Sequence, residues 1–247
     1  MRRLTFPLLL ATLLTSACVR TFAQTSGEAY VPTYIAKITT SAYAVQSVQA
    51  IVGQSFDVSL PLDTAKGEIW VLGNRYNNAI LKCMGYRINS NDQQPGATEN
   101  DIWSFKVEKA GTTYLTLNRI PSGGTENHPE KTVYFAVQAF ADGPHFTDST
   151  KTIKVKQGQN FILQLASNPT TGYQWKLGKI SKPQTAKLLM NQFNPPTDNA
   201  RVGAGGNEWW VFGAKKKGST TITLNYLRVW EKNTPPAQKA IFTVKVY

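Results

Sequence analysis

The sequence repeats itself once at a nearly constant spacing, and this constrains the fold more than any other feature. The matched pairs are residues 52–56 with 157–161, Trp70 with Trp175, Trp103 with Trp210, and residues 111–118 with 218–225. The offset is 105 for the first two pairs and 107 for the last two. This register indicates two copies of one domain, over residues 43–142 and 147–247, with a short linker at residues 141–145 (Ala-Asp-Gly-Pro-His).

Alternation with a period of two residues predicts short β-strands in the second copy. Ile222, Leu224 and Tyr226, for example, fall on one face of a strand. The predicted strands are residues 160–166, 173–177, 186–190, 208–214, 220–227 and 239–246. Glycine and proline separate them, as in the run Asn-Pro-Pro at residues 194–196. We therefore expect an all-β chain of two tandem immunoglobulin-like β-sandwich domains.

Composition narrows the functional classes. Two histidines and two cysteines argue against a zinc cluster, a haem site or a disulfide scaffold, so we expect no metal and no cofactor. The net charge of +12 is concentrated in residues 147–247, which carry 15 basic and 4 acidic side chains. Such a charge is compatible with nucleic acid, an acidic protein surface or a solvated basic face. Because nothing else in the sequence points to nucleic acid, we predict no nucleic-acid partner.

The N-terminus has the pattern of an export signal. Arg2 and Arg3 precede a short apolar run that is too short to span a bilayer. Residues 15–18 (Thr-Ser-Ala-Cys) resemble a bacterial lipobox, which predicts a signal peptide over residues 1–17, lipidation of Cys18 and a tether over residues 18–42.

Cleavage after Ala23, giving a signal peptide over residues 1–23 and a soluble secreted protein, stays open as the alternative. Either route predicts an exported monomer, in the periplasm or at the cell surface, with no membrane contact besides the lipid. Cys83 is then the only internal cysteine and is expected to be an unpaired small hydrophobic residue.

Three loops of the second copy hold its least ordinary residues. They are residues 168–172 (Asn-Pro-Thr-Thr-Gly), residues 203–206 (Gly-Ala-Gly-Gly) and residues 228–231 (Arg-Val-Trp-Glu). Because antiparallel strands alternate in direction, loops that follow every second strand emerge at the same end of a sandwich. A proline-stiffened turn, a glycine loop and an exposed tryptophan beside an arginine would form a binding surface there.

The order of these motifs resembles the chagasin family of inhibitors of papain-like cysteine peptidases. The family pattern is Asn-Pro-Thr-Thr-Gly, then Gly-x-Gly-Gly, then Arg-Pro-Trp or Arg-Pro-Phe, and here Val229 stands in place of the proline. The resemblance implies an immunoglobulin-like fold and a three-loop wedge that fills the active-site cleft of a papain-like cysteine peptidase. The residues that it assigns to peptidase binding are Asn168, Pro169, Thr170, Thr171, Gly172, Gly203, Ala204, Gly205, Gly206, Arg228, Val229 and Trp230.

Each motif also has a purely structural interpretation. Residues 168–172 alone are typical of a tight turn, and Tyr173, Trp175, Trp210 and Phe212 are expected in the core. The first copy lacks all three motifs, which predicts a degenerate chagasin-like domain. The alternative function is a non-inhibitory surface module such as an adhesin or glycan binder. We expect no enzyme, because neither His128 nor His145 lies in the motif-bearing copy. Because that copy has its own strands and core, residues 147–247 are expected to fold and inhibit alone.

Overall fold

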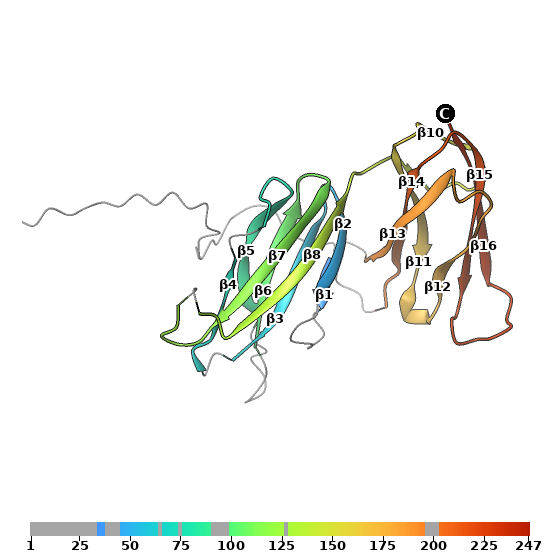
Figure 1. Cartoon of the computed structure of the whole chain (residues 1–247). Helices are drawn as coiled ribbons and strands as arrows, with labels where there is room; N and C mark the ends of the chain where they lie inside the picture. Colours follow the sequence, from blue (N-terminus) through green and yellow to red (C-terminus); the bar gives the residue numbers. More distant parts are fainter. Residues whose placement is uncertain are drawn as a thin grey trace, which may run out of the picture.

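A computed structural model describes residues 34–37 (backbone only), 45–63, 66–73, 76–89, 99–125, 128–195 and 203–247. Its described residues form two β-sandwiches joined by a short connection, which confirms the predicted fold class (Figure 1). The signal-peptide residues, Cys18 and most of the expected tether lie outside the described residues. Over the part of the chain that is described, no helix is both long and apolar enough to cross a membrane.

The first sandwich contains two four-stranded sheets. One has the order β1 (Tyr34–Lys37), β3 (Ser55–Leu62), β6 (Glu99–Val107), β5 (Leu81–Asn89). The other has the order β2 (Gln46–Ile51), β8 (Lys131–Phe140), β7 (Gly111–Ile120), β4 (Ile69–Leu72). Because β1 pairs in parallel with β3, this sandwich begins before residue 43, inside the segment that the sequence assigned to a tether.

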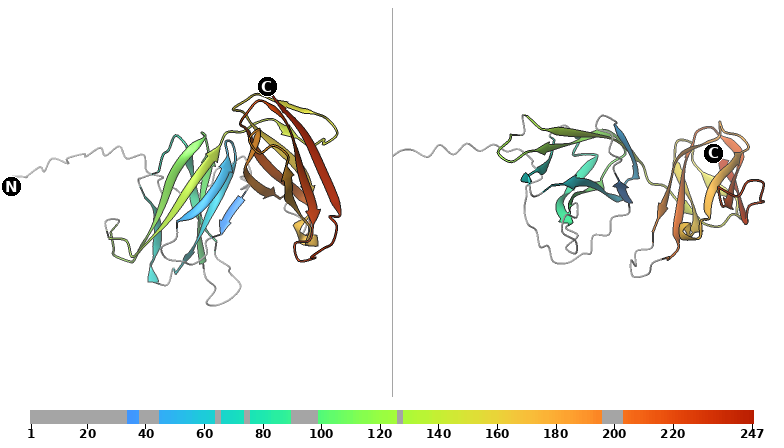
Figure 2. Two further views of the ribbon diagram at one scale, coloured as in Figure 1. Left: turned by 45° about the vertical axis from the view of Figure 1, so that its right-hand side comes forward. Right: turned by 90° about the horizontal axis from the view of Figure 1, so that it is seen from below.

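The second sandwich repeats this topology strand for strand. Figure 2 shows the two sandwiches from two further directions. One sheet has the order β13 (Ala186–Asn194), β14 (Gly206–Ala214), β11 (Asn160–Ser167), β9 (His145–Phe146). The other has the order β10 (Ile153–Val155), β16 (Gln238–Val246), β15 (Gly218–Leu227), β12 (Gln174–Ile180). All six strands predicted for this copy are present. The short strands β9 and β10 were not predicted, and β9 places the start of the sandwich before residue 147.

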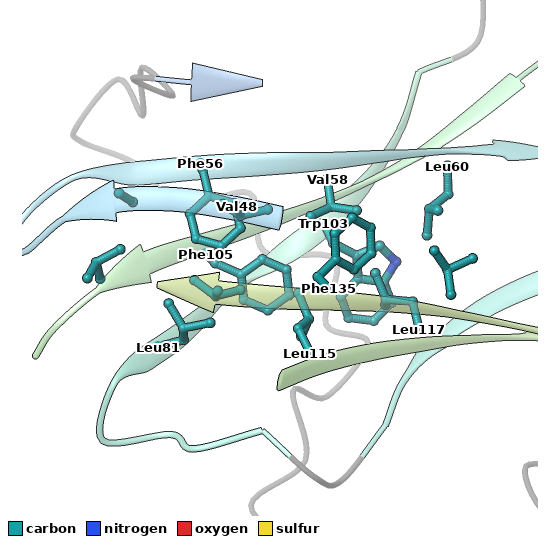
Figure 3. Packing of buried hydrophobic residues seen from close by; sticks show 14 of the residues in the cluster. Val48, Phe56, Val58, Leu60, Leu81, Trp103, Phe105, Leu115, Leu117 and Phe135 are labelled. Atoms are coloured by element: carbon teal, nitrogen blue, oxygen red, sulfur yellow. The ribbon is translucent and has the colours of Figure 1, made fainter. Parts of the chain in front are cut away.

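Each sandwich has its own hydrophobic core between its two sheets. Figure 3 shows the first core, where Phe56, Phe105 and Phe135 meet from three strands. The centroids of the Phe56 and Phe105 rings lie 5.5 Å apart, and those of Phe161 and Phe212 in the second copy lie the same 5.5 Å apart. Burial of an aromatic side chain contributes roughly 1.5–3 kcal/mol to stability, so this shared packing explains why the aromatic residues repeat.

Cys83 differs from the expectation. Its side chain is half-buried against the first core, and it is disulfide-bonded rather than unpaired. The expectation of an unpaired Cys83 therefore does not hold for the full chain, which still contains its signal residues. The sequence contains one other cysteine, Cys18, which lies outside the described residues.

Candidate functional site

The three motif-bearing loops emerge at one end of the second sandwich, as predicted. They connect β11 to β12, β13 to β14 and β15 to β16, and the first and third lie together at the lower end of this sandwich in Figure 1. We call residues 168–172, 203–206 and 228–231 the second tip. Its exposed members are Pro169, Thr170, Thr171, Gly203, Gly205, Val229 and Trp230, and its half-buried members are Asn168, Gly172, Ala204, Gly206, Arg228 and Glu231.

The first loop is a single 3-10 turn, η2 (Pro169–Thr171), held by its own hydrogen bonds. The Asn168 carboxamide oxygen accepts from the Thr170 backbone N–H at 3.3 Å and from the Thr170 hydroxyl at 2.6 Å. The Thr171 hydroxyl donates to the Asn168 carbonyl at 2.6 Å. Gly172 ends the turn with φ 82°, in the left-handed region that favours glycine. The turn is therefore pre-organised, with both threonine hydroxyl protons already donated locally.

Asn168 also ties the first loop to the second. Its Nδ2 donates to the Gly203 carbonyl at 3.0 Å, across the gap between the two loops. A side chain at Gly205 would come within 3.2 Å of the Ser167 carbonyl oxygen, and one at Gly206 would collide with the Asn194 carbonyl oxygen. Gly205 and Gly206 therefore permit close packing within the sandwich itself, whereas Gly203 is exposed and has φ 87°.

Trp230 ties the third loop to the first. A Cβ atom on Gly172 would collide with the indole ring of Trp230, so the ring lies directly against this glycine. Trp230 nevertheless keeps 61% of its surface exposed, and its neighbour Val229 keeps 50%. Exposed apolar surface of this kind is typical of binding sites. The predicted exposure of Trp230 is confirmed, together with a contact that fixes its position.

Arg228 is held from two sides. Its Cζ lies 4.4 Å from the centroid of the Tyr173 ring, and its Nη1 donates to Glu231 Oε1 at 3.0 Å. The hydrogen bond with Glu231 raises the pKa of the Arg228 guanidinium, which is ionised at any physiological pH. Tyr173 is half-buried beneath this cation and was wrongly expected in the core, while Trp175, Trp210 and Phe212 are buried as expected.

Two further residues support the tip from below and were not found by sequence reasoning. The buried Glu208 accepts through Oε1 from the Ser167 hydroxyl at 2.7 Å and from the Trp175 backbone N–H at 3.1 Å, joining three strands. The Tyr226 hydroxyl accepts from the Asn168 backbone N–H at 3.0 Å. Only the matching register of β11, β12, β14 and β15 brings these groups together, so no local sequence signal marks them.

The corresponding end of the first sandwich has different chemistry. Its described part comprises residues 63, 66–67 and 121–125, which we call the first tip. Lys66 forms an ion pair with Asp63 at 2.9 Å, and Gly67 faces Ser122 instead of a tryptophan. Arg119 forms ion pairs with Glu68 and Glu130, both at 3.1 Å, where the second sandwich has stacked tyrosines. The described part of the first tip and the residues beneath it therefore carry charged side chains that form ion pairs with one another.

The second tip carries no arrangement typical of metal chemistry. Among the described residues, no group of three or more histidine, cysteine, aspartate or glutamate side chains is placed to hold a metal ion. The basic run Lys215, Lys216 and Lys217 occupies the turn between β14 and β15, at the opposite end of the sandwich from the tip, as predicted. The second tip instead presents exposed apolar side chains on a backbone that is held in place by hydrogen bonds.

A family model agrees with this geometry in both copies. The model described as the chagasin family peptidase inhibitor I42 matches residues 49–137 and 154–246, which together exceed half of the chain. The chain belongs to the chagasin family of peptidase inhibitors. It is therefore assigned to a family of inhibitors and not of enzymes. Both sandwiches are chagasin-like, so the family match alone does not distinguish the copy that binds.

Individual proteins are also similar to parts of this chain. Chagasin of Trypanosoma cruzi is 35% identical over 82 residues, which cover 32% of this chain and 74% of that protein. Among solved structures, the cysteine protease inhibitor EhICP2 of Entamoeba histolytica is 25% identical, with a TM-score of 0.38 over 43% of this chain and 97% of that chain. PbICP-C, solved in complex with falcipain-2, is 21% identical, with a TM-score of 0.30 over 43% of this chain and 89% of that chain.

Proposed function

We propose that this chain inhibits papain-like cysteine peptidases by placing the second tip in the active-site cleft. The observation that carries the proposal is the interlocking of the three loops. Asn168 bonds to the Gly203 carbonyl, and the Trp230 ring lies on Gly172, so the loops form one rigid surface. A surface that is ordered before binding loses little conformational entropy when it binds.

The chemistry of the tip suits inhibition without turnover. Thr170 and Thr171 are exposed at the apex, and their turn is stabilised by hydrogen bonds to both the side chain and the backbone of Asn168. A segment held in a 3-10 turn is not the extended strand that peptidases bind as substrate. We infer that the turn blocks the catalytic cysteine while its own peptide bonds stay out of reach.

Trp230, Arg228 and the glycine loop would contact the walls of the cleft. Trp230 offers an exposed aromatic anchor, and Arg228 is already oriented by Glu231 and Tyr173, so its side chain loses little freedom on binding. Gly203 and Gly205 leave the second loop without bulky side chains, which allows a close approach by a partner backbone.

The experiment is a titration of papain with the full chain. We expect reversible inhibition at one inhibitor per active site, competitive with a small peptide substrate, and no inhibition of the serine peptidase trypsin at the same concentration. Full papain activity at a large excess of folded protein would overturn the proposal and favour the surface-module alternative.

We also propose that the chain is exported, as its N-terminal residues predict. Cys83 is disulfide-bonded, and Cys18 is the only other cysteine in the sequence. Lipidation would occupy the Cys18 sulfur, and cleavage after Ala23 would remove the residue, so either event would preclude a disulfide between these two residues. The intact mass of the protein isolated from its cells distinguishes a lipidated Cys18, a chain starting at Gln24 and an unprocessed disulfide-bonded chain.

A further inference from the structure

A small apolar cluster lies between the two sandwiches. Ile51 at the end of β2 packs with Ile162, Met190 and Val211 of the second sandwich, and each of the four is at most 4% exposed. Phe140, Leu189 and Trp209 pack around them. Neighbouring residues on β11 and β14, such as Phe161 and Phe212, face the second core. The cluster therefore covers the outer face of the sheet that contains β13, β14 and β11.

The equivalent outer face of the first sandwich is polar. Asp57 and Ser104 stand there at the repeat positions of Ile162 and Val211. The Ser104 hydroxyl donates to Asp57 Oδ1 at 2.7 Å, and Arg87 forms an ion pair with Asp57 Oδ2, also at 2.7 Å. Asp57 and Ser104 are themselves buried, at 0% and 6% exposed, so the two copies differ at these positions in polarity and not in burial. An apolar outer face would be costly if it were exposed to water.

The surface that the first sandwich contributes is specialised in the same way. Ile51 and Phe140 correspond by the repeat to Lys156 and Tyr247. Both of these residues are exposed in the second sandwich. Ile51, which contacts the second sandwich, is apolar, whereas its counterpart Lys156, which faces solvent, is charged. This pattern identifies the contact as a feature of the sequence as well as of the fold.

The connection between the sandwiches is attached to the second one along its length. The Asn160 Nδ2 donates to the Ala141 carbonyl, and the Ile162 backbone N–H donates to the Pro144 carbonyl, both at 3.0 Å. His145 then opens β9, with its ring edge-on to Trp209 at a centroid distance of 4.8 Å. The expected linker, residues 141–145, is therefore held against the second sandwich by these bonds, and only its last residue, His145, belongs to an edge strand.

One polar contact reaches from the first sandwich towards the second tip. Gln54 Nε2 donates to Asn194 Oδ1 at 3.5 Å, and Gln192 Nε2 donates to the same oxygen at 3.1 Å. Asn194 is the last residue of β13 and pairs with Asn207, next to Gly206, so it forms the root of the glycine loop. The first sandwich thus contacts the base of one of the three loops of the second tip.

We propose that the first sandwich is a positioning element for the second tip. It covers the apolar face around Ile162 and Val211 and holds the root of the glycine loop through Gln54, so that the two sandwiches move as one body. The inhibitory half of this inference rests on the proposed function. It differs from the expectation that residues 147–247 act alone, because that fragment would expose Ile162, Met190 and Val211.

The test uses two pairs of variants in the full chain. Ile51→Lys places the residue that the second copy carries at this turn into the apolar cluster, and Ile88→Lys makes the same change at a side chain that is 50% exposed. Gln54→Ala removes the contact with Asn194. Its control is Gln159→Ala, because Gln159 Oε1 accepts from the Lys156 backbone N–H as Gln54 Oε1 accepts from the Ile51 backbone N–H, within the same type of turn.

Nuclear magnetic resonance relaxation measures whether the sandwiches tumble together, and titration of papain gives the inhibition constant. For Ile51→Lys we expect separate, faster tumbling of each sandwich and an inhibition constant raised about tenfold. For Gln54→Ala we expect joint tumbling and a rise of about two- to threefold. Both controls should match the wild type in both measurements.

Three results would overturn the proposal. Joint tumbling of Ile51→Lys would show that the cluster does not hold the sandwiches together. Separate tumbling with an unchanged inhibition constant would show that the first sandwich does not position the tip. Loss of signal dispersion in both sandwiches would indicate that Ile51→Lys is unfolded. The comparison of Gln54→Ala with Gln159→Ala then tests the proposal, and equal inhibition constants for these two variants would overturn it. Absence of inhibition by the wild type would overturn the proposed function. The relaxation measurement would still show whether the two sandwiches are held together.

Discussion

In both sandwiches a glycine with positive φ closes the first loop of the tip, but Gly67 faces Ser122 and Gly172 faces Trp230. Below these glycines the structures are alike. Trp70 Nε1 donates to the Pro61 carbonyl at 2.9 Å, and Trp175 Nε1 donates to the Ala166 carbonyl, also at 2.9 Å. The same scaffold therefore carries a tip with an ion pair in one copy and a tip with an exposed tryptophan in the other.

The difference extends to the outer face of one sheet. The first copy has Asp57 and Ser104 where the second has Ile162 and Val211. With the core preserved, the copies differ at the tip and at the contact between them, among other surface positions. Divergence at these two places, on a preserved interior, is what we expect from the proposed division of roles, in which one copy binds and the other supports it.

The largest effect is expected when the first copy's residue is placed into the second tip. Thr171 corresponds by the repeat to Lys66, so Thr171→Lys introduces a charge at the apex of η2. A charge buried in an interface without a partner costs roughly 2–5 kcal/mol, so we expect the inhibition constant for papain to rise about 30-fold or more. The reverse change, Lys66→Thr, should leave the constant unchanged. Equal effects of the two variants would contradict the division of roles.

Trp230 distinguishes an anchor from general exposed aromatic surface. Trp230→Ala should weaken inhibition by roughly 2–4 kcal/mol, mostly through faster dissociation, because interface energy concentrates in a few aromatic anchors. Tyr114 is equally exposed, at 62% against 61%, but lies on β7 of the first sandwich. Tyr114→Ala should therefore have no effect. Surface plasmon resonance on immobilised papain measures both rates, and an unchanged dissociation rate for Trp230→Ala would contradict the anchor.

Alanine substitutions at Gly172 and Gly67 distinguish the effect of backbone strain on stability from the effect of the turn on binding. With φ 82° and 64°, both glycines would be strained by a Cβ atom, so Gly172→Ala and Gly67→Ala should each lower the free energy of unfolding by roughly 1–3 kcal/mol. Only Gly172→Ala should also displace Trp230 and weaken inhibition. Denaturant unfolding and titration of papain test the two effects, and weaker inhibition by Gly67→Ala would show that the first tip also binds.

The smallest effect concerns charge. The turn at Lys215, Lys216 and Lys217 corresponds to Glu108, Lys109 and Ala110 in the first copy, so the excess charge of the second copy is partly located there. Replacing all three lysines by glutamine should lower the association rate less than about threefold at low salt and have no effect at physiological salt. A larger loss of affinity at physiological salt would mean that binding is mainly electrostatic.

Much of the second copy could be predicted because the relevant signals are local. The six long strands follow from alternation, the positive φ of Gly172 from its turn, and the exposure of Trp230 from its place in a loop without a partner in the first copy. The first copy's start could not be predicted, because β1 is short and pairs with a strand far along the chain.

The support beneath the tip and the contact between copies escaped prediction for a different reason. Glu208 and Tyr226 act on residues more than thirty positions away, so no spacing in the sequence marks them. The contact between copies did leave a signal. Residues 161–163 (Phe-Ile-Leu) and 209–212 (Trp-Trp-Val-Phe) are continuously apolar, which is typical of strands buried on both faces. The alternation of apolar and polar residues predicted only the face of each strand that lies in the core of the sandwich.

The central claim is that the second tip, and not the first, occupies the peptidase cleft. Amide hydrogen exchange of the full chain, measured with and without an excess of papain, tests it in one experiment. The account predicts slower exchange at residues 168–172, 203–206 and 228–231 in the complex, with unchanged exchange at residues 66–67 and 121–125. Protection confined to the first tip, or the same protection at both, would contradict it.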